Sequence, residues 1–307
     1  MGLLQGLLLA VPGAVAQGVL WGIMTLGVYI TYKVLDYADL TVDGSFATGG
    51  AVTAILIVKG MNPFLSILFA LVAGCIAGCI TGMLHTKLKI PAILSGILSQ
   101  LALYSINIRI MGKANTPLLG INTVVTEVKK WVPSLSDNTV ALMLGLAVAA
   151  VVIVALYWVF GTELGCCIRA TGNNEYMVRA LGGNTDAMKI AGLMLSNGLV
   201  ALSGAMVAQT QGYADVGMGI GAIVIGLASV IIGEVLMGKR FSFAYKLASV
   251  VVGSIVYRII IAAVLQIGMK STDLKLLTAI IVAIALSVPV FKSKFKLGKF
   301  PRKQAVR

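Results

Sequence analysis

The chain has 307 residues, of which 59% are hydrophobic and 11% charged, with a mean hydropathy of +0.99 and a net charge of +13. A water-soluble domain cannot bury that much apolar surface, so the composition excludes a soluble globular protein and indicates one that crosses the membrane many times. Apolar segments occupy nearly all of these residues, which excludes a soluble catalytic or nucleotide-binding domain among them.

Nine apolar segments are expected to span the membrane, with boundaries that allow eight to ten. Most reach the ~20 residues that a helix needs to cross the hydrocarbon core. They lack the alternation of barrel strands, and helices satisfy their own backbone in lipid, so the predicted class is an all-α polytopic membrane protein with short broken helices. The segments are 12–33, 45–59, 62–85, 91–111, 138–160, 189–210, 220–237, 247–267 and 273–291. They form one transmembrane domain over 1–291, followed by a basic tail over 292–307.

The basic residues gather at particular ends of these spans. The stretch Phe291–Arg307 carries seven basic residues and no acidic one, and Lys87, Lys89 and Lys246 flank other span ends. The positive-inside rule then places the C-terminus in the cytoplasm. The basic excess is explained by topology and by attraction to anionic membrane lipids, so nucleic acid is not an expected partner.

Two polar segments interrupt the regular succession of spans. Asp36–Ser45 precedes an apolar run of about fifteen residues, which as a helix covers only ~22 Å of the ~30 Å core. Gln209–Gly221 precedes a second short run, and the topology puts the two segments on opposite faces. Paired short helices are typical of transporters, because unwound backbone at membrane depth is tolerated beside a cavity. A chance similarity explains the pair equally well.

The segment 161–189 is charged and rich in glycine. Thr171–Asn174 predicts a turn, Glu175–Leu181 a short helix, and Gly182–Thr185 a second turn in which Asn184 or Thr185 caps the next span. A short helix held between two turns at the membrane face suits mechanical coupling to a soluble motor, and an ordinary solvated loop is the equal alternative. The residues expected on a coupling surface are Arg169, Thr171, Gly172, Asn173, Glu175, Arg179, Gly182 and Asp186.

Two motifs carry a resemblance to a known family. The first is Thr162-x-x-Gly165-x-x-x-Arg169-Ala170-Thr171-Gly172-x-Asn174, followed by Arg179-Ala180-x-Gly182, Lys189 and Ser203-Gly204-Ala205; the second is Asp39-Leu40-Thr41-Val42-Asp43-Gly44-Ser45. In this order the chain resembles, over 15–292, the permease subunits of ABC importers for branched-chain amino acids and simple sugars. The second motif is similar to that of a subgroup of tryptophan/tyrosine permeases. The stretch 233–238 departs from the glycine-rich turns of many members.

The resemblance implies a set of partners in the bacterial plasma membrane. These are cytoplasmic ABC ATPase subunits docking on 161–189, a second permease copy or a paralogue, an extracytoplasmic substrate-binding lipoprotein, and membrane lipids. ATP and Mg²⁺ would belong to the ATPase, so no cofactor is expected in this chain, which also lacks a Walker A sequence. On this interpretation the chain is not an enzyme and moves an amino acid, aromatic or branched-chain.

Two other classes compete with this interpretation. Asp36, Asp39 and Asp43 have the spacing of the magnesium-diphosphate motif of intramembrane prenyltransferases. Such enzymes have an Asn before the first Asp and a second acidic cluster, and this sequence has neither. An ion-coupled secondary transporter would explain polar residues inside spans but not the match over 161–189. No metal site is expected, since His85 is the single histidine.

Polar and charged residues inside spans mark a candidate translocation pathway. They are Asp39, Thr41, Asp43, Ser45, Gln100, Asn197 and Arg258. Asp39 or Asp43 would accept the ammonium group of an amino acid, and free N–H groups at the following helix start would bind its carboxylate. The alternative, slightly favoured, is that Asp43 caps that helix and Asp39 braces the loop. For Arg258 the alternative is a bond to backbone or to Glu234, and for the amides it is helix packing.

Overall fold

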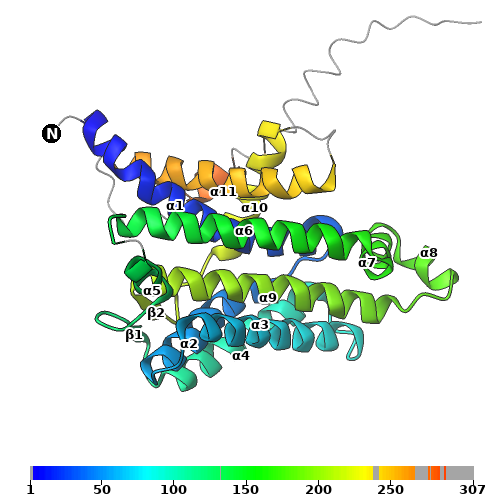
Figure 1. Ribbon diagram of the computed structural model, residues 1–307. Coiled ribbons are helices and arrows are strands. Elements are labelled where there is room, and N and C mark those ends of the chain that lie inside the picture. Colours follow the sequence, from blue (N-terminus) through cyan, green and yellow to red (C-terminus); the bar gives the residue numbers. More distant parts are fainter. Residues whose placement is uncertain are drawn as a thin grey trace, which may run out of the picture.

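The computed structural model describes residues 3–131, 133–237, 242–266, 276, 278–283 and 287. Long helices lie side by side, with α7 and α8 at one end of the bundle and the strands β1 and β2 with α5 at the other (Figure 1). We call these ends the α7–α8 end and the hairpin end.

Within the described residues, the elements follow one another as a chain of helices with one pair of short strands. The first half holds α1 (Leu3–Tyr29), a π-helical turn η1 (Ile30–Val34), α2 (Thr41–Val58), α3 (Pro63–Thr86), α4 (Ala92–Met111), β1 (Asn115–Pro117) and α5 (Val124–Trp131). The second half holds α6 (Asp137–Gly161), α7 (Glu163–Asn173), α8 (Glu175–Ala180), α9 (Thr185–Gln211), β2 (Tyr213–Asp215), α10 (Ala222–Met237) and α11 (Phe243–Gln266). The strands pair antiparallel, with Thr116 opposite Ala214.

Seven helices of the described residues are long and apolar enough to cross a membrane. They are Ala10–Val34, α2, α3, α4, α6, α9 and α11, and α10 is a shorter apolar helix of 16 residues. The all-α polytopic class is confirmed, and these elements match the first eight predicted spans in order. Most of the ninth predicted span and the whole basic tail 292–307 lie outside the described residues.

The second span begins earlier than predicted. Helix α2 starts at Thr41 and not at Ser45, so the irregular backbone before it is shorter than the expected segment Asp36–Ser45. The reason is local: the Asp39 carboxylate accepts a hydrogen bond from the Thr41 N–H at 2.9 Å and so satisfies a free donor of the first turn. Eighteen helical residues reach ~27 Å.

Helix α9 lies at the centre of the bundle, buried over most of its length against α1, α2 and α3. Small residues allow the backbones to touch. A Cβ on Gly204 would lie 2.0 Å from the carbonyl oxygen of Phe46 in α2, and one on Gly49 would lie 1.9 Å from that of Ala201. At its hairpin end, Gln209 accepts from the Val124 N–H and donates to the Pro63 carbonyl. In lipid such close packing replaces the hydrophobic drive of soluble cores.

We expect Gly204→Ala to weaken the α2–α9 contact, because the added methyl group overlaps a backbone oxygen that cannot rotate away. The free energy of unfolding should fall by about 1–3 kcal/mol, as for overpacked cores. The matched control is Gly161→Ala, where a Cβ meets nothing within 4 Å. Thermal denaturation of both purified variants measures the difference, and equal midpoints would contradict this account of the packing.

Candidate functional site

The α7–α8 end carries a compact helical projection between α6 and α9 (Figure 1). Each of its helices begins at a side-chain cap. Thr162 accepts from the Gly165 N–H, Asn174 from the Met177 N–H at 3.0 Å, and Asn184 from the Ala187 N–H at 3.1 Å. The short helix predicted over Glu175–Leu181 and the cap at Asn184 are both confirmed. Three caps in succession fix the directions in which α7, α8 and α9 leave one another.

The turn predicted at Thr171–Asn174 is wrong. Helix α7 continues through Asn173, and the chain changes direction only at Asn174. Gly172 does not serve a turn here, since it lets α7 approach η1: a Cβ at this position would lie 1.9 Å from the Val34 carbonyl oxygen. Thr171 is buried beside it and donates to the Cys167 carbonyl. Of the residues predicted for a coupling surface, these two face the protein.

Four charged side chains connect α8 to the start of α9. Glu175 contacts Lys189 at 2.6 Å and Arg179 at 2.7 Å, and Arg179 also contacts Asp186 at 3.0 Å. The hydrogen bond from Lys189, followed by the positive charges of Lys189 and Arg179, holds the pKa of the Glu175 carboxyl below its usual range. Gly182, at a φ of +82°, ends the projection. The network makes α8 a stiff attachment to α9.

Arg169 braces the projection from its other side. Its Nη2 donates to the Phe160 carbonyl at 2.8 Å and to the Cys166 sulfur, and its guanidinium lies 5.7 Å from the Phe243 ring centroid. The side chain is nevertheless exposed, as is that of Asn173. Arg169 therefore links α7 to α6 and α11 while presenting charge outward.

Two highly exposed apolar side chains, one on α8 and one at its C-cap, were missed by sequence reasoning. Tyr176 is 84% exposed and Leu181 is 79% exposed, at the outer side of the projection. They lie outside the candidate spans, so lipid tails do not account for them. The available signal was large apolar residues next to charged ones in a short helix between two turns. Exposed apolar side chains beside rigid charged ones are typical of a protein contact.

A buried polar cluster joins α2 to α9 and unites four of the predicted pathway residues. The Asp39 carboxylate accepts from the Asn197 amide at 2.7 Å, and the Asn197 amide oxygen accepts from the Ser45 hydroxyl at 2.6 Å. The Thr41 hydroxyl bonds Thr81 at 2.8 Å. All five side chains are at most 1% exposed. They bond one another and nearby backbone and hydroxyl groups, so the cluster acts as an interhelical clamp.

The sequence predicted that Asp43 caps its own helix, and this is wrong. It lies within the first turn of α2, and its two carboxylate oxygens accept from the backbone N–H groups of Gly221, at 2.8 Å, and Ile223, at 2.9 Å. These are free donors at the start of α10. The two polar segments start at opposite ends of the bundle, as predicted, with Asp36 at the α7–α8 end and Gln209 at the hairpin end, and they meet inside it at Asp43. Gly219 touches the Asp43 backbone oxygen so closely that no Cβ would fit.

A cavity of about 110 Å³ lies beside this junction, between α2, α4 and the segment before α10. Its polar lining comes from Asp43, Gln100, Tyr104 and Asn107. Asn107 is buried, and its amide oxygen accepts no hydrogen bond from the described residues. Tyr104 is 51% exposed, so the cavity opens on the outer face of α4. The structure thus gives Gln100 and Asp43 a shared hollow, and Asn107, whose buried amide oxygen is unused, lines it.

Arg258 lies neither in the buried polar cluster nor in the lining of the small cavity. It donates weakly to the Gln17 amide oxygen at 3.4 Å, and its guanidinium lies 4.0 Å from the Trp21 ring centroid, on α1. The expected alternative partner, Glu234, instead pairs with Lys33 at 3.3 Å. Arg258 therefore bonds across to α1 and not to Glu234, because α11 packs on α1 there, and its place in the pathway stays a prediction.

We expect Asp39→Asn to destabilise the chain by about 1–3 kcal/mol, because both carboxylate oxygens accept hydrogen bonds, from Thr41 and Asn197, and an amide keeps only one acceptor and turns an NH2 group toward the other donor. The exchange Asp39→Asn with Asn197→Asp restores one carboxylate and one amide, so it should recover part of the loss. Thermal unfolding of the wild type, both single variants and the exchange forms a double-mutant cycle. Additive losses would argue against the clamp.

The comparisons with known proteins agree with this architecture. Residues 12–286 match the family described as branched-chain amino acid transport system / permease component. The chain is 42% identical to a tyrosine transport system permease protein of Clostridioides difficile, over 88% of each chain. It is 33% identical to an uncharacterized protein of Rickettsia prowazekii, over 89% of this chain and 95% of that one. It is 28% identical to the inner membrane ABC transporter permease protein YjfF of Escherichia coli, over 74% of this chain and 70% of that one. The chain is thus a multi-pass protein of the bacterial plasma membrane and belongs to the family of branched-chain amino acid transport system permease components.

Proposed function

We propose that this chain is the transmembrane permease subunit of a bacterial ABC importer that moves an amino acid, with tyrosine and related aromatic amino acids as the first candidates. The observation that carries the proposal is the projection of α7 and α8, which combines an internal ion-pair network with the exposed Tyr176 and Leu181. A surface that must transmit force needs both stiffness and an apolar contact. ATP hydrolysis would take place on a separate subunit docked there.

The distribution of charge supports a cytoplasmic location for the α7–α8 end. Basic side chains of the described residues at this end are Lys33, Lys87, Lys89, Arg169, Arg179, Lys189 and Lys246. By the positive-inside rule this end would face the cytoplasm, where an ATPase is found. The hairpin end would then face outward and receive the substrate-binding lipoprotein.

The small cavity at α4 is our candidate for part of the translocation pathway. It lies where α10 begins inside the bundle, and the carboxylate of Asp43 is already bound to that helix start. An amino acid passing the cavity would therefore meet Asn107, whose amide oxygen has no donor among the described residues, and not a free carboxylate. Because the cavity opens on the outer face of α4, a second permease copy or a paralogue packed on that face would close it.

The prenyltransferase alternative finds no support in the placement of its acidic residues. Asp39 is bound by Asn197 and Thr41, and Asp43 by the start of α10. Among the residues that the structure describes, no three His, Cys, Asp or Glu side chains gather where a metal ion could bind. A magnesium-diphosphate site needs carboxylates that converge.

We expect Leu181→Ser and Tyr176→Ser to weaken binding of the ATPase by roughly 30-fold, the effect of losing an interface hot spot of about 2 kcal/mol. Both side chains are exposed, so the fold should be unchanged. Co-purification with the cognate ATPase measures the effect. The matched control is Leu119→Ser, equally exposed at the hairpin end, which should retain the ATPase. If both the Leu181 and the Tyr176 variants retain the ATPase fully, these side chains do not form its docking surface.

We expect Asn107→Leu to lower tyrosine uptake about tenfold while leaving stability unchanged or improved, because the replaced amide oxygen is buried without a donor. Uptake of labelled tyrosine and of leucine, in cells carrying the complete importer, checks both the site and the substrate class. Thr116→Val is the control, since its buried hydroxyl also has no partner among the described residues but lies at the hairpin. Normal uptake in the Asn107 variant would exclude this cavity from the pathway.

A further inference from the structure

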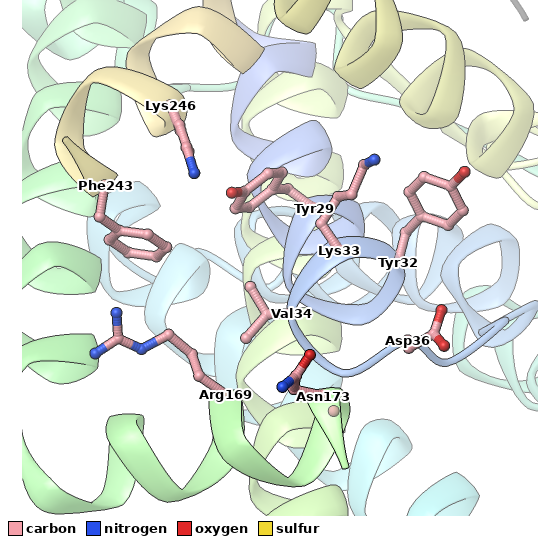
Figure 2. Close-up of a pocket in the computed structure, with 10 residues that line it drawn as sticks. Tyr29, Tyr32, Lys33, Val34, Asp36, Arg169, Asn173, Phe243 and Lys246 are labelled. Carbon is pink, nitrogen blue, oxygen red and sulfur yellow. The ribbon is translucent and has the colours of Figure 1, made fainter. Parts of the chain in front are cut away.

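Two hollows adjoin on the α7–α8 end. The first has a volume of about 660 Å³ and is lined by side chains of α1, η1, α7 and α11 (Figure 2). The second, of about 580 Å³, follows the last turns of α6. Arg169 and Phe243 line both, so the hollows join at these two side chains. Together we call them the α6–α11 groove.

The first half of the α6–α11 groove is basic. Lys33, Arg169 and Lys246 line it against a single carboxylate, Asp36. Figure 2 shows the Lys246 ammonium group extending toward the space between Phe243 and Tyr29, with Arg169 below and Asp36 across the pocket from it. Lys33 is partly neutralised by Glu234. Lys246 has no acidic partner among the described residues, and Arg169 uses only Nη2 in its hydrogen bonds. The basic half therefore has an excess of positive charge and unused donors.

The second half of the groove is apolar and lies on a membrane span. Val154, Tyr157 and Trp158 are 67%, 56% and 72% exposed in the last two turns of α6. Tyr and Trp near the end of a span are typical of the boundary between lipid tails and headgroups. The groove therefore passes from the level of the acyl chains to the level of the headgroups, and it changes from apolar to basic over that distance.

We propose that the α6–α11 groove binds one anionic phospholipid, with its phosphate between Arg169 and Lys246 and an acyl chain along Val154 and Trp158. Phosphate oxygens match the guanidinium and ammonium donors, and basic pockets between membrane helices suit anionic headgroups. A soluble phosphate would match only the basic half and leave the apolar half uncovered. The lipid would join α7 to α11 across the pocket and so steady the projection that ends in α8.

The test is native mass spectrometry of the full chain with phosphatidylglycerol or phosphatidylcholine of the same acyl chains. We expect phosphatidylglycerol to be retained at least about tenfold better, since both lipids carry the phosphate but the choline ammonium of phosphatidylcholine cancels its charge and is repelled by Arg169 and Lys246. Lys246→Gln should reduce retention about fivefold, the effect of one interfacial cation. Trp158→Ser should also reduce it. The controls are Lys87→Gln, a basic residue of the same end outside the groove, and Trp131→Ser, an exposed tryptophan near the hairpin end.

Three results would overturn the assignment. Equal retention of the two lipids would show that the site does not select an anionic headgroup. Unchanged retention in both Lys246→Gln and Trp158→Ser would show that the lipid does not bind in the α6–α11 groove. Displacement of the lipid by inorganic phosphate, together with unchanged retention in Trp158→Ser, would reassign the basic half to soluble phosphate. If Lys246→Gln does not fold, Trp158→Ser still tests the groove, because its side chain is exposed and its loss leaves the core intact.

Discussion

The structure depends on one constraint: inside a bilayer, each polar group must find its partner within the protein. Helix α10 shows the consequence most directly. It begins inside the bundle, where the Ala222 N–H bonds the preceding turn at Gly219 and Asp43 of α2 supplies the acceptors for the N–H groups of Gly221 and Ile223. The carboxylate and the broken helix therefore require each other. The charge of Asp43 and the free N–H groups at the start of α10 would each be costly in lipid alone, and they stabilise each other by binding.

The same constraint gives the Asp39–Asn197–Ser45 cluster its form. The carboxylate of Asp39 and the amide of Asn197 are both bonded, and the glycine contacts at Gly49 and Gly204, next to the cluster, bring the backbones of α2 and α9 close enough for short bonds. Polar bonding and close packing thus support one another at this interface. The unused amide oxygen of Asn107 is the exception in this region, and for that reason it carries the functional argument there.

The sequence allowed the spans, the short helix over Glu175–Ala180 and the cap at Asn184 to be predicted, because these follow from local hydropathy and local turn chemistry. It did not allow the partners of Asp43 or Arg258 to be predicted, because those partners lie far away along the chain. The turn at Thr171–Asn174 failed for a related reason. Position 172 must be glycine because the backbone of Val34 lies against it. From one sequence, a glycine that allows such a close backbone contact looks the same as a glycine that allows a turn.

Helix α9 has a mechanical consequence for how the two ends of the molecule communicate. Its 27 residues form one uninterrupted rod of ~40 Å. One end is fixed to α8 through Lys189 and Glu175, and the other is fixed through Gln209 to the backbones of α5 and α3. A rod anchored at both ends does not absorb a push by bending. Displacement of α8 along this axis would reach the hairpin end almost undiminished, so the two membrane faces are joined by a single stiff element and not by a relay of loops.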